Sequence, residues 1–113
     1  MNRNSTIEHP AAQCQEMTPP TGDPVATRFP LGQLLITPNA QSRLHPTDVF
    51  SALSRHAAGN WGQLGKQDRQ ENDLSLEQGF RLLSAYRDRF GIRFWIITDA
   101  ERCATTILLP EDY

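Results

Sequence analysis

The sequence predicts an α+β domain in which a small antiparallel sheet of about four strands carries two helices on one face. Three observations support this fold class. The chain has 113 residues, which is enough for one small domain and too few for two. Apolar residues recur at helical spacing near the middle of the chain and alternate with a period of two from Arg81 onwards. The resulting order, β-α-α-β-β-β, is typical of helices packed on one sheet.

Residues 1–28 are predicted to form a disordered N-terminal tail. The residues there are mostly small or polar, so burial would not offset the entropy lost on ordering them. A tail that folds on a partner is the alternative. The prolines that interrupt any periodicity are Pro10, Pro19, Pro20 and Pro24. The single domain is therefore expected to span residues 29–113.

The first ordered elements are a short strand and two helical segments. The apolar run 31–37 ends at Pro38 and predicts a strand followed by a turn. Residues 39–44 are expected to form one short helical turn. A longer helix is predicted over residues 46–57, because proline suits its first position and Gly59 is a natural stop. Its apolar stripe comprises Val49, Phe50, Leu53, His56 and Ala57.

A glycine-rich loop over residues 59–65 surrounds one large aromatic residue, Trp61. A second, shorter helix is predicted over either 68–72 or 75–80, and Ser75 begins a capping-box pattern that favours the second choice.

Three strands complete the chain, over residues 81–87, 92–98 and 103–109. The segments between them are short enough to be hairpin loops. We therefore expect an antiparallel three-stranded meander, which the strand over residues 31–37 joins.

Charge and composition narrow the class of protein. Eleven Lys and Arg residues stand against thirteen Asp and Glu residues, a net charge of -2. A general nucleic-acid binder normally has a basic surplus, so any contact with nucleic acid must come from a local patch. No apolar run approaches the ~20 residues of a membrane helix, and no secretory leader opens the chain. We expect a cytoplasmic protein without membrane contact, in which Cys14 and Cys103 stay reduced.

His56 is the most informative single residue. It shares the apolar stripe of the predicted helix and lies close to the loop around Trp61. One interpretation is a structural histidine that hydrogen-bonds the loop backbone. The other is a general acid or base, for which imidazole has a suitable pKa.

Arginines and hydroxyl groups surround this candidate in the strand region. Arg81 and Arg87 are candidates for stabilising a phosphate, alongside the binding candidates Arg89 and Arg93. The hydroxyl candidates for positioning it are Ser84, Tyr86 and Thr105. Solvated strand ends are the plain alternative for the arginines. Trp61 is either a core anchor or a platform on which a base stacks. The histidines and cysteines offer no pair with ligand spacing within one helical turn. Asp68, Glu71 and Asp73 are either a carboxylate magnesium site or a solvated charged face, and the second is favoured, so no metal or cofactor is expected.

From Leu31 to Tyr113 the chain resembles a family of short, largely uncharacterised proteins found on bacterial phages, plasmids and integrated elements. The family pattern usually has aspartate at position 60 and glutamate at position 112, where this chain has Asn60 and Asp112. The first departure argues against an acidic role at position 60. The resemblance rests on His56 to Gly62 (HAAGNWG), Asp68 with Asn72, Arg81 to Tyr86 (RLLSAY), Trp95 to Thr98 (WIIT) and Thr105 to Tyr113 (TTILLPEDY).

The order of elements is also similar to that of small bacterial ribonuclease toxins of the RelE, colicin and barnase-like group, which cleave RNA without metal. That resemblance implies an RNA-cleaving, toxin-like module in which His56 transfers a proton. The alternative is a non-enzymatic protein of a mobile element that binds and inhibits a host defence complex. A regulatory or structural protein with no site is the third hypothesis. The partner is therefore RNA or a host protein complex, and the oligomeric state stays open.

Overall fold

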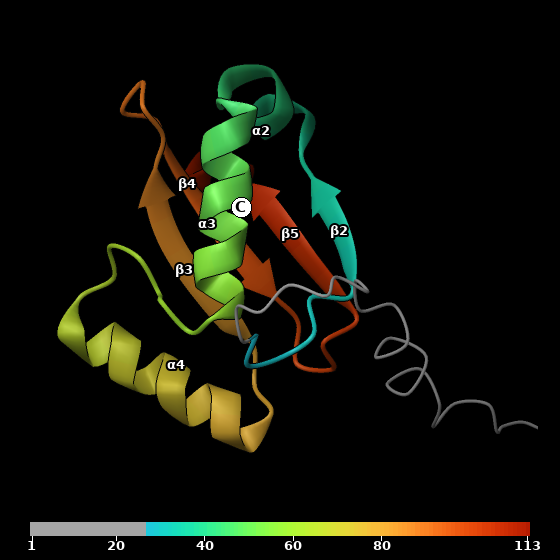
Figure 1. The fold of residues 1–113 in the computed structure, drawn as a ribbon, viewed down its shortest axis with the longest axis vertical. Coiled ribbons are helices and arrows are strands. Elements are labelled where there is room, and N and C mark those ends of the chain that lie inside the picture. The colour runs from blue at the N-terminus through green and yellow to red at the C-terminus, as the bar shows by residue number, and fades with distance from the viewer. Residues whose placement is uncertain (1–26) are drawn as a thin grey trace, which may run out of the picture.

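The computed structural model describes residues 27–113, and most of the predicted tail lies outside the described residues. The α+β class and the small four-stranded sheet are confirmed (Figure 1). In chain order the elements are β2 (Gln33–Ile36), α2 (Pro38–Arg43), α3 (Pro46–Ala57), α4 (Lys66–Gln78), β3 (Leu82–Arg87), β4 (Arg93–Thr98), β5 (Ala104–Leu108) and the 3-10 helix η1 (Pro110–Asp112).

The sheet has the strand order β2-β5-β4-β3. Strands β3, β4 and β5 form the predicted antiparallel meander. Strand β2 joins it beside β5, but in parallel, so the sheet is mixed rather than wholly antiparallel. Parallel pairing needs a long crossover, and here the chain passes through three helices and two strands before β5 returns beside β2. Local sequence patterns carry no information about that direction.

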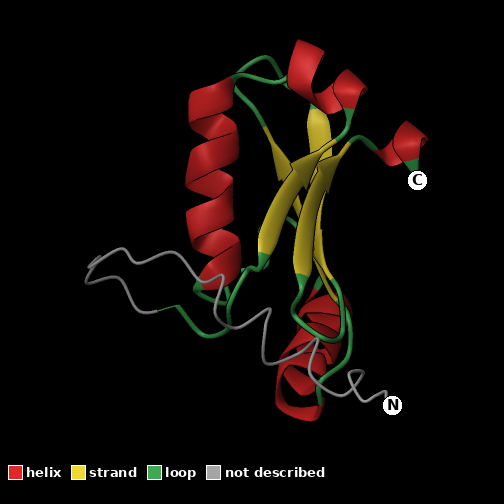
Figure 2. Cartoon of the chain, turned by 90° about the vertical axis from the view of Figure 1, so that its right-hand side faces the viewer, coloured by secondary structure: helices red, strands yellow, loops and turns green. Residues whose placement is uncertain are grey.

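Helix α3 has the predicted bounds and covers one face of the sheet (Figure 2). Pro46 occupies its first turn, and the His45 side chain accepts a hydrogen bond from the backbone of Thr47. At the other end the amide of Asn60 donates to the Arg55 carbonyl oxygen, with Gly59 at a φ of +84°. These contacts form a Schellman-type end, which requires a left-handed residue and explains the glycine.

Helix α4 is one continuous helix that contains most of both predicted short segments, so the choice between them was wrong. The segment Lys66–Gln78 has few apolar residues, and only Asn72 in it is buried. A helix of this kind leaves little apolar periodicity to detect. It lies at the end of the sheet where β3 begins (Figure 2).

The main core lies between α3 and the sheet, and a smaller cluster lies at the end of the sheet where β3 begins. The main core includes Ala40, Leu44, Val49, Ala52, Leu53, Tyr86, Phe94, Ile96, Ile107 and Leu109. The smaller cluster contains Phe29, Trp61 and Leu82. Phe50, which the sequence placed on the buried stripe, is 72% exposed and belongs to neither cluster.

Two further expectations concern the redox state of the cysteines and the absence of a membrane-spanning helix. Cys103 is disulfide-bonded, contrary to the expectation of a reduced thiol. Among residues 27–113, no helix has the length and apolar character needed to cross a membrane.

Candidate functional site

The first group of predicted site residues meets inside the molecule. His56, Ser84 and Thr105 have no exposed surface. The His56 ring lies between two hydroxyl groups: Nδ1 contacts Ser84 Oγ, and Nε2 lies 2.9 Å from Thr98 Oγ1. The helix stripe and the strand alternation therefore bring these polar groups together under α3, away from solvent.

The donors and acceptors of this buried hydrogen-bond network can be assigned in only one way. Thr105 donates to the Leu31 carbonyl oxygen over 2.7 Å, so its oxygen must accept the hydroxyl of Thr98, also at 2.7 Å. Thr98 is then the acceptor for the Nε2–H group of His56, and Nδ1 accepts the hydroxyl of Ser84. Each of these side chains has a hydrogen-bond partner when the histidine is neutral and carries its proton on Nε2.

The same surroundings keep the histidine uncharged. Burial lowers the pKa of His56 from 6.5 to about 3, and the positive charge of Arg102 contributes in the same direction. The rings of Phe29 and Trp61 pack edge-on against the imidazole, with centroids 5.3 and 5.7 Å away. The geometry therefore favours the structural interpretation of His56 over the acid–base one, since no substrate atom can reach the ring.

Tyr86 and Trp61 are also structural. Tyr86 is 2% exposed, and its hydroxyl donates to the Asn60 carbonyl oxygen over 2.6 Å. Burial raises the pKa of this phenol to about 12. Trp61 is 3% exposed and donates from its indole nitrogen to Asp73 over 2.9 Å. Its indole therefore anchors the loop to the core and offers no free face for a base to stack on.

Arg89 is tied to a carboxylate. Its Nε and Nη2 atoms lie 2.9 and 3.0 Å from the two Asp48 oxygens, and its backbone amide donates to the same group. This arginine lowers the pKa of Asp48 to about 2. A bidentate pair of this kind anchors the β3–β4 hairpin to the start of α3 and competes with any phosphate for the guanidinium.

The remaining three arginines lie together on the opposite face of the sheet. Arg87 and Arg93 are direct cross-strand partners, and Trp95 is on the same face of β4 two residues after Arg93. Arg81 extends the same alternation just before β3 begins. Apart from η1 near one end, no described helix runs along this face (Figure 2). We call it the uncovered face.

Tyr113 contacts both Arg81 and Trp95. The Arg81 guanidinium donates to the Tyr113 hydroxyl over 2.6 Å and lies 5.8 Å from the centre of its ring. The same ring packs edge-on against Trp95, with centroids 5.7 Å apart. Tyr113 is 67% exposed. Among residues 27–113, neither Arg81, Arg87 nor Arg93 forms an ion pair with a carboxylate.

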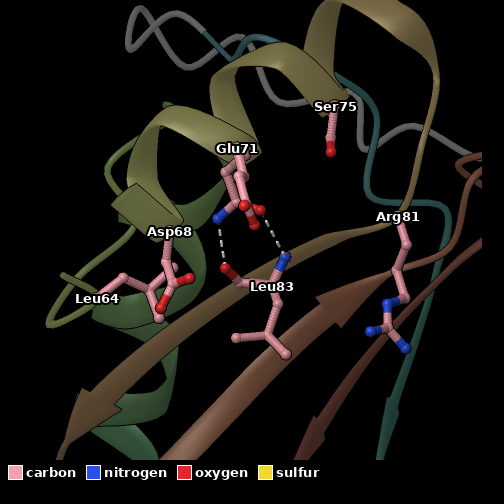
Figure 3. A pocket seen from close by; sticks show the side chains of 7 residues that line it. Leu64, Asp68, Glu71, Ser75, Arg81 and Leu83 are labelled. Atoms are coloured by element: carbon pink, nitrogen blue, oxygen red, sulfur yellow. Dashed lines mark hydrogen bonds between the residues drawn. The ribbon is translucent and has the colours of Figure 1, made fainter. Parts of the chain in front are cut away.

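A hollow of about 310 Å³ borders the uncovered face, between α4 and the start of β3 (Figure 3). Arg81 lies on one side of it, and Asp68 and Glu71 come from α4 on the other. At its floor the Asn72 amide pairs with the backbone of Leu83. The two carboxylates, Asp68 and Glu71, make this hollow unfavourable for a phosphate.

Sequence reasoning separated residues that the fold unites. It named the three arginines as candidates but assigned no site role to Trp95 or Tyr113. Arg93 and Trp95 share a face by strand alternation, but Arg87 is placed beside them only by the β3–β4 register, which pairs it with Arg93. Comparison of the chain with family models, curated proteins and solved structures gave no match.

Proposed function

We propose that this protein binds single-stranded nucleic acid, without cleaving it, through the uncovered face of its sheet. One observation carries the proposal: three arginines without carboxylate partners and two aromatic side chains share one face along which no described helix runs. The inference concerns the partner alone, because the buried histidine supplies no proton transfer.

The chemistry of the uncovered face suits a flexible strand. Guanidinium groups bind phosphates with two parallel hydrogen bonds, and exposed aromatic rings stack on bases of any sequence. Arg81 and Arg87 are six residues apart, which corresponds to roughly 20 Å along an extended strand. That span matches the shortest footprints of single-strand binders, about four nucleotides. Trp95 and Tyr113 lie between the two ends of this line.

Charge predicts that the binding is weak and sensitive to salt. Residues 27–113 contain ten Lys and Arg residues and ten Asp and Glu residues, so no overall field attracts a polyanion. The attraction comes from the three arginines of the uncovered face. A duplex is too stiff and too wide to present its bases to this flat surface, so we expect a preference for single strands.

The test is fluorescence anisotropy of labelled 12-nucleotide oligo(U) and oligo(dT), titrated with the full chain at several salt concentrations. Three phosphate contacts predict a slope of about -2 in log K against log salt, because each contributes about -0.7 on single strands. The variant carrying both Arg87→Gln and Arg93→Gln should bind more weakly, with a slope of about -0.7. Arg69→Gln, on the exposed surface of α4, is the matched control and should bind like the wild type.

Trp95→Leu separates stacking from charge in the same assay. Leucine keeps an apolar side chain beside Tyr113 but offers no aromatic face, so binding should weaken about 10-fold or more at an unchanged salt slope. A wild-type chain that binds neither oligonucleotide at low salt would contradict the proposal and favour the host-protein hypothesis. Cleavage of the RNA probe by purified wild type, lost in the double arginine variant, would restore the enzyme hypothesis on this face.

A further inference from the structure

The two edges of the sheet differ in how they are protected. At the β3 edge, the Asn72 side chain pairs with the backbone of Leu83. Two residues further along β3, the Ala85 carbonyl oxygen accepts from the amide of Gln63, and the Ala85 amide donates to the Trp61 carbonyl oxygen. Helix α4 and the glycine loop thus occupy the hydrogen-bonding groups of this edge. Unprotected edges invite pairing with another chain, and here one edge is blocked.

The β2 edge has none of these protections. All four residues from Gln33 to Ile36 are exposed, and none is charged. Leu34, Leu35 and Ile36 are 49%, 42% and 37% exposed. Edge strands of monomeric proteins usually carry a lysine, a proline or a bulge that prevents association. The strand itself has none, since the prolines of this region lie outside it.

Among residues 27–113, no strand pairs with the outward backbone groups of β2. The amides of Gln33 and Thr37 donate to carbonyl oxygens in and beside β5, over 2.9 and 3.0 Å. In a parallel pair, alternate residues point their amide and carbonyl groups to the same neighbour. Leu34 and Ile36 therefore direct theirs away from β5, where no described residue meets them.

An apolar groove extends this edge towards α3. Its volume is about 410 Å³, and its lining includes Ile36, Leu44, Val49 and Phe50. Phe50 is the most exposed of the large hydrophobic side chains in the described part of the chain. The strand edge and the groove thus form one continuous apolar surface without a charged residue in its lining.

We propose that a second copy of this chain pairs with β2 in an antiparallel fashion, about a two-fold axis that passes midway between Leu35 and the partner's Leu35. In this register Leu34 exchanges two main-chain hydrogen bonds with the partner's Ile36, and symmetry repeats the exchange. Leu35 then lies opposite the partner's Leu35 on the uncovered face. The exposed side chains of Leu34 and Ile36 contact their counterparts beside the groove.

The absence of charged residues from β2 favours a second copy of this chain over a strand from another protein as the partner. A copy related by a two-fold axis brings each group opposite its own kind, which is costly for charges and harmless for leucine and isoleucine. A charged foreign segment finds no complementary group on this edge. The contact involves one four-residue strand from each copy and should bury less than the ~800 Å² per subunit of a standard interface, so we expect a dimer of micromolar affinity.

Pairing at β2 does not depend on nucleic-acid binding, but it has a consequence for it. The two-fold axis is perpendicular to the sheet, so the dimer has one continuous eight-stranded sheet with both uncovered faces on the same side. A strand long enough to reach both faces then binds more tightly than a short one, through effective concentration.

A charge-swap experiment tests the dimer with the full chain in sedimentation equilibrium. The wild type should show a mass that rises with concentration from 12.8 kDa towards twice that value. Leu35→Lys and Leu35→Glu should each weaken dimerisation about 100-fold, because each places like charges opposite one another and loses a buried leucine pair. An equimolar mixture of the two variants should form a heterodimer. Phe90→Lys changes an exposed aromatic in the β3–β4 hairpin and should leave dimerisation unchanged.

Recovery of association in the mixture shows that both variants are folded, so loss of structure cannot imitate the expected result. A wild type that stays monomeric at all concentrations up to about 1 mM would overturn the proposal. So would a dimer that persists in each single variant, or a mixture that stays monomeric.

Discussion

The interpretation of His56 as catalytic or structural depends on its surroundings in the fold. In the sequence it is a histidine near a glycine loop, a setting that suits catalysis. In the fold both ring nitrogens are engaged and the residue has no exposed surface. Two hydroxyl groups satisfy the ring. Removal of the ring would deprive the buried Ser84 hydroxyl of its imidazole acceptor and would leave Thr98 with Thr105 as its partner. The residue therefore specifies how α3 docks on β3 and β4.

A pH dependence of stability follows from the low pKa of His56. The unfolded chain binds a proton near pH 6.5 and the folded chain near pH 3, so the unfolded state holds more protons between these values. This contribution to stability is present above pH 6.5 and is lost as the pH falls. From pH 7 to pH 5 the free energy of unfolding should fall by about 2 kcal/mol, at about 1.4 kcal/mol per pH unit.

Urea unfolding at the two pH values measures this change, and the interval lies above the range in which carboxylates ordinarily titrate. Imidazole ¹⁵N spectra at pH 5 provide a second readout, which should show His56 neutral with its proton on Nε2. Equal stability at pH 7 and pH 5, or a charged His56 at pH 5, would refute the buried-network interpretation. His45→Gln is the control and should preserve the fall in stability, because His45 lies at the start of α3 and outside the network.

At the scale of elements, the blocked β3 edge depends on one close backbone approach. Gly62 has a φ of +72° and pairs with Ala85, and a Cβ atom there would collide with the Ala85 carbonyl oxygen. Gly91 has a similar φ of +83° but open space around it. The two glycines therefore share the conformational requirement and differ in the contact.

Gly62→Ala should destabilise the domain by about 3 kcal/mol or more, whereas Gly91→Ala should cost about 1 kcal/mol from backbone strain alone. Thermal or urea unfolding of the two variants gives the comparison. Equal losses in both would mean that the loop moves away from β3 at little cost and that the edge is not firmly blocked.

The whole molecule has an uneven distribution of stability. Helix α4 buries only Asn72 and is joined to β3 by few contacts, whereas β4 lies between two strands and beneath α3. Hydrogen exchange followed by mass spectrometry should therefore show the amides of α4 exchanging first and those of β4 last. Protection of α4 equal to that of β4 would contradict this order and indicate a single cooperative unit.

Local sequence patterns were sufficient to predict several helices and strands of this molecule. Helix α3 has the predicted bounds because Pro46, Gly59 and a buried stripe act within a few residues of one another. The meander followed from short hairpins between strands of period two. Helix α4 was misjudged because Asn72 is its only buried residue and Leu76 is only partly buried against the smaller cluster, which leaves little apolar periodicity. Such features depend on neighbours along the chain, and the chain alone reports them.

The roles of the candidate residues depend instead on contacts between distant segments. Strand alternation showed which residues of one strand share a face, but which face α3 covers follows from docking. That docking placed Ser84 and Thr105 in the interior and left Arg87 and Trp95 on the uncovered side. The parallel pairing of β2 likewise follows from closure of the whole sheet. Such contacts arise from burial and register summed over the entire domain, and no local stretch of sequence contains that sum.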